Sequence, residues 1–143
     1  MDYSSLLSKQ RAFFSSHVTK DIAFRKSALL KLKQALLAHE QEILKALHTD
    51  LHKGVYEAYT SEIGFTLHEV DYHLAHLSKW AAPEKVRTSF INQPGKSYIY
   101  KEPYGVVLII APWNYPLQLL LDPLIGAIAA GNCGIVKPSE MAP

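Results

Sequence analysis

The apolar residues in the first part of the chain recur at helical spacing in three separate runs. The third run is the most regular, because its apolar residues follow one another at intervals of four, three, four and three positions: Ile63, Leu67, Val70, Leu74 and Leu77. This spacing places them on one face of an α-helix. Pro83 predicts the end of that helix, since proline cannot continue its hydrogen-bond ladder.

The two earlier runs also predict amphipathic helices. The first covers residues 2–18, and Asp2 can cap it. The second begins at Asp21 and predicts either one long helix or two helices joined near residues 39–40, with Gly54 closing it. Three helices whose apolar faces need partners predict a helical layer that packs against another part of the same protein.

The pattern changes after residue 90. Pro94-Gly95 predicts a turn, and β-rich runs on both sides of residues 103–105 predict a hairpin or a strand–turn–strand unit. Residues 106–110 are apolar without alternation, as in a strand covered on both faces.

A helix and a second strand are expected next. Residues 116–130 predict a helix with Pro116 in its first turn, ended by Gly131-Asn132, and Ile135-Val136 begins another short buried strand. Strand, helix and strand in this order form the βαβ unit of an open parallel sheet, with a right-handed crossover. The predicted fold class is therefore α/β.

Composition narrows the classes of function. The length of 143 residues suits one domain, and 48% apolar with 20% charged residues is a globular composition. Fifteen basic and thirteen acidic residues are spread along the chain, so we expect no nucleic-acid partner. A single cysteine excludes an intrachain disulfide. The first residues of the chain lack the features of a signal peptide, so we expect a cytoplasmic protein. No segment is apolar enough to span a bilayer, so we expect no membrane anchor in these residues.

Short polar segments follow both predicted parallel strands. APWNYP follows residues 106–110, and KPSE follows Ile135-Val136. Since ligands bind at the carboxyl ends of such strands, Asn114, Lys137 and Glu140 can converge on one cleft. Two prolines stiffen the loop of Asn114, which suits its amide for donating a hydrogen bond to a developing oxyanion. The alternative is that Asn114 caps the following helix.

Lys137 and Glu140 also have two interpretations. Their ammonium and carboxylate groups can bind the hydroxyls of a nucleotide ribose. Alternatively, Lys137 is an ordinary residue after a strand, while Ser139 caps a helix whose positive end suits Glu140.

Three other features are expected to be structural. Cys133, between a helix stop and a strand, is interpreted as a small buried thiol with a raised pKa. PGKS at residues 94–97 lacks the glycine of a phosphate loop at Phe90 and is interpreted as a turn. His73 and His76 share a helix face without the spacing of a zinc helix, so no metal is expected.

The motifs taken together resemble the aldehyde dehydrogenase superfamily. The resemblance is carried by PWNYP, the small-residue helix after it, GNCGIVKPSE and the preceding YKEPYGVVLIIAP. EQEILKALHTDLHKG, EAYTSEIG and the ending at residues 80–83 are similar to the class 3 and fatty aldehyde dehydrogenase branch. The resemblance implies an incomplete Rossmann-like parallel sheet, with residues 1–95 as the helical segment of the cofactor domain and residues 96–143 as a strand or hairpin and the first βαβ unit of the dinucleotide-binding domain.

The resemblance also implies a reaction, in which aldehydes are oxidised to carboxylic acids through a cysteine thiohemiacetal, with NAD or NADP as cofactor. Asn114 would be the oxyanion-hole donor, and Tyr115 would lie near the aldehyde tunnel. The cofactor would be contacted by six residues: Ile110, Ala111, Pro112, Trp113, Lys137 and Glu140. Glu140 favours NAD, because a carboxylate bonds a 2′-hydroxyl and repels a 2′-phosphate, although members of this branch also accept NADP.

The resemblance further implies a homodimer. It places the family's nucleophilic cysteine and general-base glutamate outside these residues, so we expect the 143 residues alone to be inactive. The alternative function is that of a naturally truncated, non-catalytic binding or oligomerisation module, whose helix faces are buried by self-association.

Overall fold

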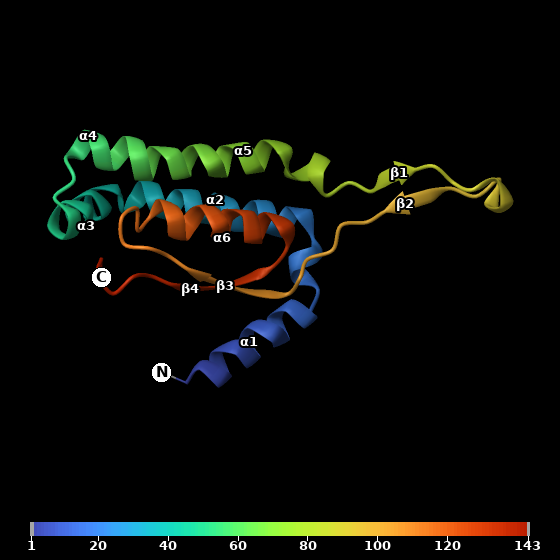
Figure 1. Cartoon of the computed structure of the whole chain (residues 1–143), viewed down its shortest axis with the longest axis horizontal. Helices are drawn as coiled ribbons and strands as arrows, with labels where there is room; N and C mark the ends of the chain where they lie inside the picture. The colour runs from blue at the N-terminus through green and yellow to red at the C-terminus, as the bar shows by residue number, and fades with distance from the viewer. Residues whose placement is uncertain (1, 143) are drawn as a thin grey trace.

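The computed structural model describes residues 2–142, which form a layer of helices stacked on a small sheet, with a hairpin arm that projects from one end (Figure 1). The helices are α1 (Tyr3–Ser15), α2 (Ile22–Ala38), α3 (Glu40–Leu51), α4 (Val55–Ala58), α5 (Gly64–Trp80) and α6 (Gln118–Ala130). The strands are β1 (Glu84–Val86), β2 (Ser97–Ile99), β3 (Val106–Ile110) and β4 (Cys133–Lys137). Short helical turns lie at Val18–Lys20, Tyr59–Ile63 and Phe90–Asn92.

The central unit is the predicted βαβ. Strands β3 and β4 pair in parallel, and α6 connects them and packs on both. In Figure 1 the strands lie between α6 on one side and α1 on the other, and α1 also contacts both strands. The α/β fold class is therefore confirmed.

The apolar stripe of α5 supplies much of the core. Leu67, Val70 and Leu77 are buried, and Leu74 packs beside them. One cluster joins α5 to α2 and α6 through Leu29 and Ile125, which are fully buried. A second cluster joins α2, α3 and the turn before α5. Because α2, α5 and α6 bury these faces against one another, the N terminus of α6 has a fixed position relative to α5.

The second predicted run is two helices, and the predicted role of Gly54 is wrong. Chain direction changes at His39, which lies between α2 and α3. Helix α3 ends at Leu51 because His52 itself adopts the left-handed conformation, with φ of 55°. Gly54 has φ of −67° and instead precedes the first turn of α4.

Of the two alternatives for residues 103–105, the hairpin is wrong, whereas strands do lie on both sides of this segment, as β2 and β3. Strand β2 pairs antiparallel with β1, with Glu84 opposite Ile99 and Val86 opposite Ser97. The hairpin turn lies at Pro94-Gly95, where the Gly95 amide donates to the Asn92 carbonyl at 2.8 Å. The turn prediction for PGKS is thus confirmed, while β2 belongs to the projecting arm rather than to the parallel sheet (Figure 1).

Two details of the βαβ unit differ from expectation. Within residues 2–142, β3 is not covered on both faces, since Leu108 and Ile110 are 63% and 65% exposed. Pro116 lies before the first turn of α6, which begins at Gln118 after Leu117.

The end of α6 depends on a glycine and a buried arginine. Gly131 has φ of 89°, a left-handed conformation that ends the helix. The buried Arg25 guanidinium donates to the carbonyls of Thr19, Lys20 and Ala129 at 2.6, 3.1 and 3.2 Å. A Cβ at residue 131 would lie 2.7 Å from that guanidinium, so both the backbone angle and the close contact require glycine.

Candidate cofactor and oxyanion site

The two polar segments leave the sheet side by side. The parallel register places Ile110 opposite Lys137, the last residues of β3 and β4. The Ala111 amide extends the pairing by donating to the Lys137 carbonyl at 3.1 Å. Because both strands end at the same edge, APWNYP and KPSE start from neighbouring points, as the strand order predicted.

The Asn114 loop presents an unengaged amide. The Asn114 side chain is exposed, and within residues 2–142 no hydrogen bond holds its amide group. Its main-chain carbonyl accepts a hydrogen bond from Lys53 Nζ at 2.9 Å. The first turn of α6 is capped instead by Glu62, whose Oε2 accepts from the amides of Leu117 and Gln118 at 2.9 and 3.3 Å. The alternative in which Asn114 caps α6 is therefore wrong.

A buried ion pair lies beneath this loop. Lys53 and Glu62 are 7% and 0% exposed, and Lys53 Nζ donates to Glu62 Oε1. The same ammonium lies 4.0 Å from the ring centroid of Tyr115, a distance at which a cation is attracted to the ring face. Sequence reasoning missed both residues. The available signal was the position of Glu62 directly before Ile63, next to the apolar stripe of α5.

The other residues expected at the cofactor cleft differ in exposure. Ile110, Pro112 and Trp113 are exposed, whereas Ala111 is buried. Tyr115 is partly exposed above Lys53. The exposed members lie on the surface that follows the end of β3, where a ligand can reach them.

Lys137 and Glu140 form an ion pair after β4. Both side chains are exposed, and Lys137 Nζ donates to Glu140 Oε1. The hydrogen bond from Lys137 lowers the pKa of the Glu140 carboxyl, so this group is a carboxylate at neutral pH. The pair thus presents a donor and an acceptor at one point, an arrangement that fits the two hydroxyls of a ribose. Ser139 Oγ accepts from the Met141 amide at 3.2 Å within a turn, and no helix follows β4 in the part of the chain that the structure describes.

Comparison with known proteins identifies the family. The family model described as "Aldehyde dehydrogenase family" matches residues 2–143. The chain belongs to the aldehyde dehydrogenase family. It is 54% identical over 93% of its length to 4,4'-diaponeurosporen-aldehyde dehydrogenase of Staphylococcus aureus, of which it covers 29%. It is 41% identical over 97% of its length to the dimeric NADP-preferring aldehyde dehydrogenase of Canis lupus familiaris, of which it covers 31%.

A solved structure supports the same conclusion. The substrate-bound state of Staphylococcus aureus AldH matches 98% of the chain at 51% identity, with a TM-score of 0.92. The chain covers 31% of that structure, so it spans about a third of the length of these relatives. Similarity to family 3 members, such as member B1 of Mus musculus at 44% identity, agrees with the class 3 resemblance.

In this aldehyde dehydrogenase chain, Cys133 lies at the other end of the sheet. It is opposite Val106, the first residue of β3, whereas the site follows Ile110 and Lys137. Four residues of strand separate the two ends by about 13 Å. Burial also raises the pKa of the Cys133 thiol. The interpretation of Cys133 as a buried thiol with a raised pKa is confirmed.

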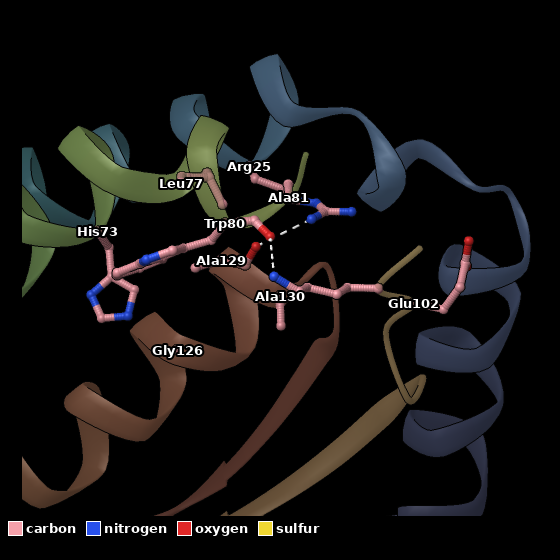
Figure 2. Close-up of a pocket in the computed structure, with 10 residues that line it drawn as sticks. Arg25, His73, Leu77, Trp80, Ala81, Glu102, Gly126, Ala129 and Ala130 are labelled. Atoms are coloured by element: carbon pink, nitrogen blue, oxygen red, sulfur yellow. Dashed lines mark hydrogen bonds between the residues drawn. The ribbon is translucent and has the colours of Figure 1, made fainter. Parts of the chain in front are cut away.

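A separate pocket lies at the far end of α6. It has a volume of about 220 Å³ and is lined by residues that include Arg25, Trp80 and Glu102. Figure 2 shows the Arg25 guanidinium directed toward the Ala129 carbonyl at this pocket. A helix of the length of α6 spans about 20 Å, so the pocket is remote from the Asn114 loop at its opposite end.

Two histidines of α5, His73 and His76, contact the backbone of their own helix. His73 Nδ1 lies 2.9 Å from the Glu69 carbonyl oxygen, and His76 Nδ1 lies 2.7 Å from that of Tyr72. Among residues 2–142, no group of three or more His, Cys, Asp or Glu side chains is arranged to hold a metal ion. Over the same residues, no helix is both long and apolar enough to cross a membrane.

Proposed function

We propose that the protein carrying this chain oxidises aldehydes to carboxylic acids with NAD or NADP, and that these residues supply the oxyanion donor and part of the cofactor cleft. The observation that carries the proposal is the exposed, unengaged Asn114 amide on an anchored loop, in a chain of the aldehyde dehydrogenase family. The neighbouring Lys137–Glu140 pair adds a group suited to a ribose.

The proposed chemistry assigns each group one task. A cysteine thiolate outside these 143 residues attacks the aldehyde carbon and forms a thiohemiacetal. Asn114 donates a hydrogen bond to the oxygen as negative charge develops on it. Tyr115, on the same loop, borders the path of the aldehyde.

The cofactor site is proposed at the adjacent strand ends. Lys137 and Glu140 bind the hydroxyls of the adenosine ribose. The remaining contacts come from the segment after β3: Ile110, Ala111, Pro112 and Trp113. When bound, the nicotinamide cofactor would accept the hydride from the thiohemiacetal carbon, and water would then hydrolyse the resulting thioester to the carboxylic acid and release the cysteine thiol.

Cofactor preference and assembly belong to the same proposal. Glu140 supports NAD as the first cofactor, since its carboxylate repels a 2′-phosphate. The relative from Canis lupus familiaris is named NADP-preferring and dimeric, which supports NADP as a second cofactor and a homodimer as the assembly. Cytoplasmic localisation stays a prediction.

A direct assay tests the proposal. The purified protein is mixed with aliphatic and aromatic aldehydes and with NAD or NADP, and reduced cofactor is followed by absorbance while the carboxylic acid is identified by mass spectrometry. We expect one equivalent of acid for each reduced cofactor. Absence of both products with every aldehyde would refute the proposed function.

A further inference from the structure

The buried pair of Lys53 and Glu62 directs its remaining hydrogen-bonding capacity to one short segment. Lys53 Nζ donates to the Asn114 carbonyl and lies against the Tyr115 ring. Glu62 Oε2 accepts from the amides of Leu117 and Gln118. Thus both charges, in addition to binding each other, hold the stretch from residue 114 to residue 118 at its two ends.

Core stability alone does not account for this pair. Removing two charges from water costs more free energy than their attraction returns unless further hydrogen bonds satisfy them, and an apolar pair of similar size often stabilises a core as well. Here the further bonds all go to the loop and to the first turn of α6. The Glu62 carboxylate also lies at the positive end of the α6 dipole, where a negative charge is favoured.

The anchored groups are the main-chain carbonyl of Asn114 and the amides of the turn that follows it. The carbonyl is fixed by Lys53, and the turn is fixed by Glu62. The side-chain amide of Asn114 is left without a partner among the described residues. Catalytic donors must be held in place before the reaction, because a displacement of about 1 Å can cost on the order of 100-fold in rate.

We propose that Lys53 and Glu62 are positioning residues that hold the Asn114 amide in the orientation needed to donate to the oxyanion. The proposal rests on the proposed function for its catalytic consequence. The anchoring of residues 114–118 does not depend on that function.

The kinetic test is a double-mutant cycle in the whole protein that carries this chain. Glu62→Gln keeps the side-chain size and removes the charge, and Asn114→Ala removes the donor. We expect E62Q to lower kcat by about 10- to 100-fold, with the KM for the cofactor unchanged, because the ribose-binding groups lie on a different segment. In the Asn114→Ala background, E62Q should lower kcat by less than about twofold further, because the donor it positions is already absent.

The control substitution is Asp71→Asn. It breaks the pair between Lys33 and Asp71, in which the Asp71 side chain is 55% exposed and far along the helix from the loop. We expect kcat unchanged in this variant. An equal loss of kcat from E62Q with and without Asn114, or wild-type kcat in E62Q, would overturn the proposal.

Hydrogen exchange separates this proposal from the proposed function. If the wild-type protein oxidises no aldehyde, the proposed function fails, and the amide exchange of residues 114–118 then decides whether Lys53 and Glu62 anchor this segment. We expect these amides to exchange at least about tenfold faster in E62Q than in the wild type, and Lys53→Met replaces E62Q if that variant does not fold. The control D71N should exchange at the wild-type rate. Unchanged exchange in these amides would overturn the anchoring.

Discussion

At the scale of single residues, the Asn114 amide is a group whose removal should affect chemistry and leave folding intact. Asn114→Ala should lower kcat by about 10²- to 10³-fold, equivalent to about 2.7–4 kcal/mol of transition-state stabilisation. The midpoint of thermal unfolding should be unchanged, because the side chain is exposed and unengaged within residues 2–142. Asn92→Ala, at an exposed asparagine of the arm, is the matched control and should retain wild-type kcat. Wild-type kcat in Asn114→Ala would contradict the oxyanion role.

Cys133 should behave in the opposite way. Its thiol is buried at the start of β4, and burial raises its pKa, so little reactive thiolate is present at neutral pH. Cys133→Ala should therefore leave kcat within about twofold of the wild type. Alkylation of the Cys133 peptide, followed by mass spectrometry, should be slow in the folded protein and fast in urea. Loss of all activity on this substitution, with folding intact, would show that the thiol takes part in the reaction.

At the scale of elements, the predictable features are those encoded within one element. The α5 stripe is visible because residues three and four positions apart return to the same helix face. Asn114, Lys137 and Glu140 are visible because each lies at or shortly after the end of an apolar run that predicts a strand. Strand β1 is too short to show alternation, and only its pairing with β2 defines it. The position of Glu62 beside Ile63 is a local signal for its burial. Its partner is 55 positions away and that of Lys53 is 61 positions away, so no local pattern reveals which residues they contact.

One glycine within α6 and the glycine that directly follows it provide an element-scale prediction. Gly131→Ala should destabilise the protein by about 1–3 kcal/mol, because the residue needs a positive φ and its Cβ would meet the Arg25 guanidinium. Gly126→Ala is the matched control: apart from the adjoining residues and the backbone of α6 itself, no atom lies within 4 Å of a Cβ there, so alanine should stabilise the helix by about 0.5–1 kcal/mol. Chemical denaturation measures both. Equal effects of the two substitutions would contradict the proposed packing of Arg25 on the end of α6.

At the scale of the whole molecule, the described residues 2–142 carry the proposed donor and the proposed cofactor-binding groups, while their single cysteine, Cys133, is buried. We therefore expect a polypeptide of residues 1–143 to form no reduced cofactor from aldehydes above a boiled control. Reduced cofactor formed by the pure polypeptide would contradict this prediction.

The state of association of the 143-residue polypeptide distinguishes the two functional hypotheses. A stable, discrete oligomer in light scattering favours a binding module, whereas aggregation favours part of an enzyme. The exposed Leu108 and Ile110 on the sheet face make aggregation the expected result.

The projecting arm carries the last prediction. Among the residues that the structure describes, strands β1 and β2 pair only with each other, and a two-stranded hairpin is marginally stable in water by itself. At its far end, Phe90 and Ile91 are 90% and 91% exposed, and the arm extends away from the helices (Figure 1). An exposed apolar tip on such a hairpin favours burial against a second subunit, in agreement with the proposed homodimer.

Phe90→Ser with Ile91→Ser should therefore weaken the proposed dimer of the whole protein. Burial of each large apolar side chain stabilises an interface by about 1.5–3 kcal/mol, so loss of both should raise the dimer dissociation constant by more than about 100-fold. Light scattering across a dilution series measures this change. Lys85→Ser with Lys96→Ser, at two exposed positions of the same arm, is the control and should leave the dimer intact. Equal dissociation constants for the apolar and the lysine variants would place the subunit contact elsewhere on the molecule.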